Sequence, residues 1–99
     1  MRNDIRGKMK IKVTISRLLR HLSQLSSDLE AFEVEAPDAV GCLRVTLERF
    51  PSMRHWAFEE EGTMRPQIWF FVNGERLPDN ELAKPLKDGD ELLIFFHQL

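Results

Sequence analysis

Few side chains in this sequence could carry out chemistry, and they do not form a catalytic or metal-binding set. The histidines His21, His55 and His97 are scattered, and no group of His, Cys, Asp and Glu has the spacing of a metal site. There is no glycine-rich phosphate loop and no nucleophile paired with a base. We therefore expect a protein that is not an enzyme and that needs neither a cofactor nor a metal.

Cys42 and the acidic run Glu59-Glu60-Glu61 are the remaining candidates. Because Cys42 is the only cysteine, no intrachain disulfide can form, and we expect a reducing, cytoplasmic environment. Nothing nearby in the sequence would activate its thiol, so we expect it to fill space in a helix. The acidic run is expected to be a solvated loop, and a contact with a basic patch on a partner is the alternative.

The size and composition indicate one small domain. Ninety-nine residues with 42% hydrophobic content are enough for one core. Residues 1–8 are polar and lack the apolar stretch of a signal peptide. We expect them to be a disordered extension that precedes a single domain at 9–99.

Charge is unevenly distributed, although the net charge is only −2. Residues 1–20 carry seven Lys or Arg against Asp4 alone, whereas residues 21–99 carry seven against fifteen Asp or Glu. The basic end lacks interleaved aromatic residues, so we expect no nucleic-acid partner. No apolar run approaches the roughly 20 residues that span a bilayer, so we expect no membrane partner.

Two alternating segments in the first third predict a pair of strands. Residues 9–15 and 31–36 each place apolar side chains on one face and polar or charged side chains on the other. Antiparallel pairing would set the outward glutamates of the second strand opposite Lys10 and Lys12. Leucines at spacings of four and three predict a short helical turn within 17–25 that fills only part of the connection.

The main helix is predicted to start at Pro37-Asp38. Asp38 can accept a hydrogen bond from a free N–H of the first turn, and Pro51 ends the run. Gly41 either weakens the helix or marks close packing. One further helical turn is expected at 53–57. Apolar residues at spacings of three, four and three predict the stripe that packs on the sheet: Val40, Leu43, Leu47 and Phe50.

The last third contains two apolar strands and two turns. Residues 67–72 are apolar on both faces, and Asn73-Gly74 is a strong hairpin signal because both residues tolerate the positive φ of a type I′ turn. The return arm is short and ends at Pro78. Asp88-Gly89-Asp90 then turns the chain into a final apolar strand at 91–96. The predicted order is two strands, a helix, a strand, a short strand and a strand.

In this order and at these distances, the elements resemble the MoaD/ThiS family of ubiquitin-like sulfur carriers. The resemblance extends from about Met9 to the end, and it depends on Val72-Asn73-Gly74 and on Pro85–Leu92 before the last strand. It implies an α+β, ubiquitin-like β-grasp fold, in which a four- to five-stranded mixed sheet carries one main helix on one face.

In that family the function resides in a flexible tail that ends in Gly-Gly. The resemblance implies that an E1-like enzyme adenylates the last carboxylate, that sulfur replaces AMP, and that the thiocarboxylate donates sulfur to a cofactor precursor. The sequence here ends at His97-Gln98-Leu99, and alignment on Asp88-Gly89-Asp90 places the expected pair just beyond Leu99. Three explanations stay open: a chain shortened before the glycines, a precursor-type or degenerate family member, or a β-grasp domain that works only by binding.

Strand parity predicts which side chains face away from the helix. If Phe70 faces the helix, its neighbours on the same strand face the opposite side, and the last strand alternates in the same way. An outward aromatic patch of this kind usually marks a partner site. The alternative is that residues 16–30 or 51–66 fold over it. The predicted partner-binding residues are Trp69, Phe71, Leu93 and Phe95, together with the chain end His97, Gln98 and Leu99.

Two functions follow from these expectations. The first is a sulfur-carrier-type protein that presents its C-terminus to an E1-like adenylating enzyme, to a larger synthase subunit, or to both, in cofactor or thio-nucleoside biosynthesis. That activity is conditional on a diglycine tail, which this sequence does not contain. The second is a non-conjugating β-grasp interaction module of an adaptor or antitoxin-like kind. In either case we expect a monomer when the protein is free.

Overall fold

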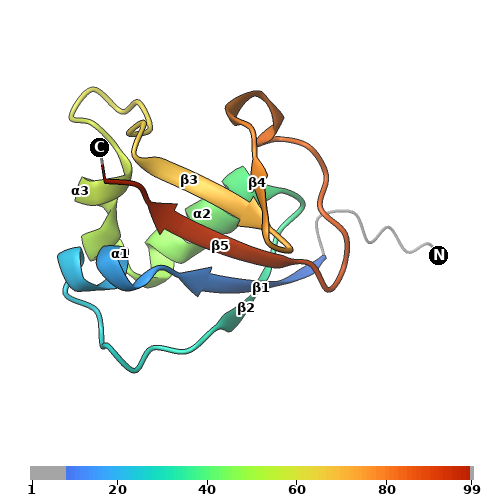
Figure 1. The fold of residues 1–99 in the computed structure, drawn as a ribbon, viewed down its shortest axis with the longest axis horizontal. Coiled ribbons are helices and arrows are strands. Elements are labelled where there is room, and N and C mark those ends of the chain that lie inside the picture. The colour runs from blue at the N-terminus through green and yellow to red at the C-terminus, as the bar shows by residue number, and fades with distance from the viewer. Residues whose placement is uncertain (1–8, 99) are drawn as a thin grey trace.

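The computed structural model describes residues 9–98, so the extension expected at 1–8 and the terminal Leu99 lie outside the described residues. The chain forms one five-stranded sheet in the order β2-β1-β5-β3-β4 (Figure 1). β1 and β5 run parallel at its centre, and the other neighbours are antiparallel. The strands are β1 (Lys10–Ile15), β2 (Phe32–Glu35), β3 (Ile68–Val72), β4 (Glu75–Leu77) and β5 (Glu91–Phe96).

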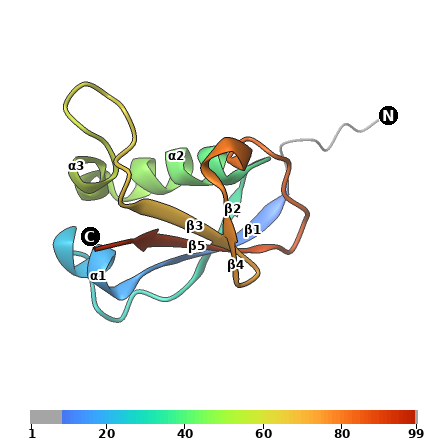
Figure 2. The same cartoon turned by 45° about the horizontal axis from the view of Figure 1, so that its top comes forward.

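One main helix, α2 (Ala39–Arg49), lies across one face of this sheet (Figure 2). It begins as predicted, because Oδ1 of Asp38 accepts a hydrogen bond from the Gly41 N–H at 2.7 Å. The short helices η1 (Pro51–Met53) and α3 (Arg54–Ala57) continue along the same side. Among the described residues, no helix is long and apolar enough to cross a membrane.

The predicted apolar stripe of α2 needs one correction. Val40 was expected to face the sheet, but it is 38% exposed. The buried side chains of α2 follow one another at spacings of three, one, three and one residues, beginning at Ala39. Val40 is the next residue after Ala39, so its side chain points about 100° away from that of Ala39 around the helix axis. The side chains on that buried face are Ala39, Cys42, Leu43, Thr46 and Leu47.

Gly41 marks close packing, as the sequence suggested. A Cβ at this position would lie 3.2 Å from the Cβ of Ala36 and 3.2 Å from Cδ of Pro37. Glycine therefore lets the first turn of α2 approach the end of β2.

The helix α1 (Arg17–Leu22) lies at one end of the sheet, beside the end of β5 (Figures 1 and 2). Leu19 is fully buried in the core, and Ser52 of η1 donates a hydrogen bond to the Ser23 carbonyl at 2.7 Å. These contacts join α1 to the layer formed by α2 and η1. The helical turn predicted within 17–25 is confirmed, and it closes one end of the core.

The two turns of the last third hydrogen-bond to each other. Asn73 has φ of 51° and Gly74 has φ of 89°, as a type I′ turn requires. The Asn73 amide donates from Nδ2 to Oδ1 of Asp90 at 3.0 Å, and its Oδ1 accepts from the Glu91 N–H at 2.9 Å. Asp88 accepts a hydrogen bond from the Lys10 N–H at 2.7 Å. The turns thus tie the starts of β1 and β5 to the end of β3 and set the register between them.

Candidate docking surface

The register between β3 and β5 places four large apolar side chains on the face away from α2. Trp69 pairs with Phe95, and Phe71 pairs with Leu93. All four are partly exposed. Their chain neighbours point the other way and are buried at 0–1% exposure: Ile68, Phe70, Leu92 and Ile94. The alternation expected from the sequence is therefore present, and we call these four outward residues the outer aromatic patch.

Inside the patch the rings cover one another. The Phe71 and Phe95 rings meet edge to face, with centroids 5.7 Å apart and planes at 85°. Trp69 lies 6.3 Å from Phe95 and 6.4 Å from Phe71. These are the separations at which aromatic pairs attract. The patch is therefore a surface held in shape by its own contacts, while other side chains make up the core and the residues packed against it.

Trp69 lies between a cation and an imidazole. The His97 ring stacks on it with centroids 3.9 Å apart and planes at 12°, and the Arg76 guanidinium carbon lies 3.6 Å from the ring centroid. Two groups this close to one indole would overlap if they shared a face, so they occupy opposite faces. Arginine over tryptophan is a favourable cation–π pair. The stack joins β4, β3 and the residue that follows β5.

Arg76 was absent from the predicted site, although the sequence contained a signal for it. A two-residue turn at Asn73-Gly74 forces Val72 to pair with Glu75 and Phe71 to pair with Arg76, and this is the observed register. Directly paired residues lie on the same face of a sheet. The alternation of side chains, followed from β3 through the turn into β4, would therefore have predicted that Arg76 lies on the same face as the patch.

The C-terminal end of the chain leaves the sheet beside the patch. The His97 N–H donates to the Gln67 carbonyl at 2.6 Å, which extends the β3–β5 pairing by one residue beyond the strands. Gln98 is exposed, and the predicted contribution of Leu99 lies outside the described residues. Three of the predicted site residues, Trp69, Phe95 and His97, are thus brought together with the chain end.

Residues 51–66 and 16–30 were the segments considered as possible covers of the outer aromatic patch. Much of each segment lies away from the patch. In the 51–66 segment, Met53 and Ala57 are fully buried in the core on the side of α2. Beyond them the chain forms a loop in which Glu59 pairs with Arg65 at 3.1 Å, and Glu60 and Glu61 are exposed. In the 16–30 segment, Leu19 of α1 is part of the core.

Cys42 lies in the core, as expected of a space-filling residue. Burial, followed by the nearby Asp38 carboxylate, raises the pKa of the Cys42 thiol to about 12, so the thiol is protonated at neutral pH. No group of three or more His, Cys, Asp or Glu within residues 9–98 could hold a metal ion. The candidate site is therefore an exposed surface, the outer aromatic patch, and it does not include a metal cluster or a reactive thiol of the described residues.

No protein-family model matches the sequence, and no curated protein matches it significantly. Solved structures do match. The small archaeal modifier protein 1 from Methanosarcina acetivorans aligns at 20% identity with a TM-score of 0.73, over 90% of this chain and 93% of that one. The Haloferax volcanii protein of the same name aligns at 17% identity with a TM-score of 0.72, over 90% and 96%.

A third match is a chain of the complex of subunits 1 and 2 of the molybdopterin-converting factor from Helicobacter pylori. It aligns at 20% identity with a TM-score of 0.58, over 92% of this chain and 97% of that one. The fold is a ubiquitin-like β-grasp of the MoaD/ThiS kind. The strand order, the parallel central pair and the helix on one face all agree with the predicted fold class.

Proposed function

We propose that this chain is a ubiquitin-like, sulfur-carrier-type protein that presents its C-terminus to an E1-like adenylating enzyme and then to a larger synthase subunit. The observation that carries the proposal is the position of the chain end, which leaves the central strand β5 beside the outer aromatic patch. One partner can then contact the patch and receive the tail at the same time. The fold likeness to a molybdopterin-converting factor complex supports this proposal.

The sheet is a rigid base for such a tail. β5 is hydrogen-bonded to β1 as far as Ile94 and to β3 as far as Phe96, and the Phe96 N–H also donates to Oγ of Ser16 at 3.4 Å, so the strand is held along its whole length. Side chains on regular elements hold a geometry better than those on loops. The tail itself must thread a narrow channel toward a nucleotide, and only glycine lets backbone approach so closely without a Cβ in the way. The proposed activity therefore requires a Gly-Gly sequence after Leu99.

In the proposed reaction this chain supplies a carboxylate and a docking surface. The terminal carboxylate oxygen attacks the α-phosphate of ATP, pyrophosphate leaves, and an acyl-adenylate forms. A hydrosulfide ion then attacks the acyl carbon, AMP leaves, and the product, after loss of a proton, is a thiocarboxylate, which is the sulfur donor. The partner enzyme supplies the nucleotide site and the sulfur, and the cytoplasm is the compartment where a reduced sulfur donor of this kind would act.

The experiment is to sequence the open reading frame beyond codon 99 and to measure the intact mass of the natural protein. The full chain is then incubated with ATP and its E1-like enzyme. We expect an AMP adduct, or the mass gain of sulfur replacing oxygen when a sulfur donor is present. A diglycine-ended chain that forms neither adduct would overturn the proposal, and replacement of the terminal glycine by alanine is the matched control.

A second function, a non-conjugating adaptor or antitoxin-like module, is favoured by the attachment of the chain end. His97 is held by a backbone hydrogen bond to Gln67 and by its stack on Trp69. A chain end that is fixed to the sheet as far as residue 97 is expected of a module that binds its partner through the sheet face and does not extend a tail into the partner. A stop codon directly after Leu99 would favour this function, and size-exclusion chromatography should then show a free monomer that forms a stable complex with its partner.

A further inference from the structure

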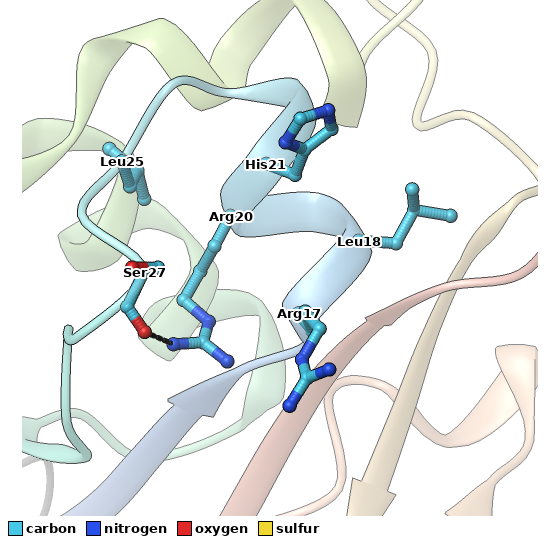
Figure 3. A pocket seen from close by; sticks show the side chains of 6 residues that line it. All are labelled: Arg17, Leu18, Arg20, His21, Leu25 and Ser27. Atoms are coloured by element: carbon cyan, nitrogen blue, oxygen red, sulfur yellow. Dashed lines mark hydrogen bonds between the residues drawn. The ribbon is translucent and has the colours of Figure 1, made fainter.

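A second surface feature lies apart from the outer aromatic patch. A hollow of about 690 Å³ opens between α1 and the loop that follows it (Figure 3). The residues that line it are Arg17, Leu18, Arg20, His21, Leu25 and Ser27. Two arginines, a histidine and a hydroxyl are thus grouped with two leucines, and no carboxylate lines the hollow.

Arg20 is fixed in place by the loop. Its Nη1 donates to the Ser27 carbonyl at 2.8 Å and to the Leu29 carbonyl at 3.2 Å, and Figure 3 shows its side chain reaching the loop at Ser27. Its Nε is buried and has no hydrogen-bond partner among the described residues. A guanidinium held in this way loses little conformational freedom when it binds an anion.

The positive charge at the hollow has no acidic counterpart in the described part of the chain. Arg17 is exposed and extends to the same side of α1 as Arg20 (Figure 3). The ion pairs within residues 9–98 are formed elsewhere, by Arg65–Glu59, Arg76–Asp79 and Lys84–Glu81. Asp28 and Glu30 follow in the same loop, but both are exposed and neither lines the hollow. The charge is therefore available to an anion from outside.

The apolar residues and the position of the hollow restrict that anion further. Leu18 and Leu25 are partly exposed at its walls, so a ligand that fills it presents apolar surface next to its charge. α1 contacts β5, and the Ser16 N–H just before α1 donates to the Ile94 carbonyl at 2.9 Å. The hollow thus lies next to the same end of the sheet from which the C-terminus leaves.

From this charge complementarity and position, we infer that the hollow binds an acidic, partly apolar segment of a protein partner, with a carboxylate on the arginines and a leucine-like side chain against Leu25. The planar guanidinium fork matches a carboxylate, and arginine is enriched at protein interfaces. This recognition does not use the tail or its activation, so it stands or falls separately from the proposed function.

The direct test is an NMR titration of the full chain with a synthetic peptide of alternating glutamate and leucine. The matched peptide carries glutamine in place of glutamate, and inorganic phosphate is the third arm. We expect the glutamate peptide to shift backbone signals of residues 17–29, and added salt to weaken its binding because the Debye length falls from about 10 Å at 0.1 M to about 3 Å at 1 M. The glutamine peptide should bind at least about tenfold more weakly.

Two double variants locate the site. Arg17→Gln with His21→Gln removes an exposed guanidinium and an exposed imidazole of the hollow and should weaken the glutamate peptide by roughly tenfold. Lys84→Gln with His55→Gln removes one cationic side chain and one imidazole from exposed positions outside the hollow and should leave binding unchanged. Arg20→Lys keeps the charge but removes the planar guanidinium fork that matches a carboxylate, so it also reports whether that fork contributes to binding.

Three results would overturn the inference. The first is the absence of shifts at residues 17–29 with the glutamate peptide. The second is an equal loss in both double variants, which would indicate net charge rather than a site. The third is phosphate binding at residues 17–29 more tightly than the peptide, which would assign the hollow to a free anion.

Discussion

The two faces of β5 are built from similar residues and have different surroundings. Leu92 is 1% exposed beneath α2, whereas Leu93, its chemically identical neighbour, is partly exposed on the opposite face. Ile94 and Phe95 repeat the contrast. Apolar character along a central strand therefore does not by itself separate a core from a binding surface.

The faces differ in composition in a way that matches this contrast. The inner face is mainly aliphatic and packs against the helix layer. The outer face of β3 and β5 carries Trp69 and two phenylalanines, with Arg76 and His97 stacked at its margin. Tryptophan and arginine are the residues most enriched where binding energy concentrates. This difference in composition supports the proposal that the outer face contacts a partner, which the following variants test.

The largest effect on stability is expected on the inner face. Ile94→Ala removes a fully buried side chain between β5 and the helix layer, and it should lower the free energy of unfolding by about 3 kcal/mol. Urea unfolding followed by circular dichroism measures this loss. Leu93→Ala is the matched control and should cost less than half as much. Equal losses would show that the two faces are buried to the same extent.

The turn that sets the register should come next. Asn73→Ala forces alanine into positive φ and removes two side-chain hydrogen bonds, so it should cost about 2 kcal/mol. Asn73→Gly keeps the backbone conformation and loses only the hydrogen bonds, which should cost about 1 kcal/mol. Urea unfolding of both variants separates the two contributions. If the Asn73→Ala and Asn73→Gly variants had the same free energy of unfolding, backbone strain at residue 73 would make no contribution to stability.

The outer face should tolerate charge that the inner face does not. Phe71→Asp with Phe95→Asp should cost about 1–2 kcal/mol from lost cross-strand contacts, leave a cooperative melt, and abolish binding to the E1-like enzyme or synthase subunit. Phe70→Asp with Ile94→Asp is the inner counterpart and should not fold. Thermal melting and a pull-down with purified partners measure both properties. Loss of the cooperative melt in the outer variant would place Phe71 and Phe95 in the core.

The smallest effect is expected at the margin of the patch. Arg76→Gln removes the cation over Trp69 and should cost about 0.5 kcal/mol. The emission of Trp69 should change as well, and a Trp56→Phe background isolates it. His97→Ala removes the opposite side of the stack and should also speed hydrogen exchange at the residue 97 N–H, which donates to the Gln67 carbonyl. Unchanged Trp69 emission in both variants would mean that the stack does not persist in solution.

On the outer face of β1 and β2, the alternation of apolar and charged residues in the sequence predicted the strand pairing correctly. In β1 and β2, Lys10 pairs with Glu35 and Lys12 pairs with Glu33, as the charges in the sequence indicated. Each strand there has one apolar and one polar face, so only one orientation buries its apolar side chains. β3 and β5 are apolar on both faces, and their pattern gives no such preference. Their orientation was predicted only on the condition that Phe70 faces the helix.

The sequence by itself determined the elements, their order and the two turns, because these depend on local signals: alternation with period two, the Asp38 cap, and residues that tolerate positive φ. The resemblance of these elements and turns to the MoaD/ThiS family also implied the β-grasp fold. The tertiary structure alone decided which part of α2 meets the sheet, so that Val40 is exposed, and it brought Arg76 and His97 onto Trp69. Those contacts join the β3–β4 hairpin to the residue that follows β5, which is distant in sequence, and they form only after sheet twist and strand register have set side chains within a few ångströms of one another.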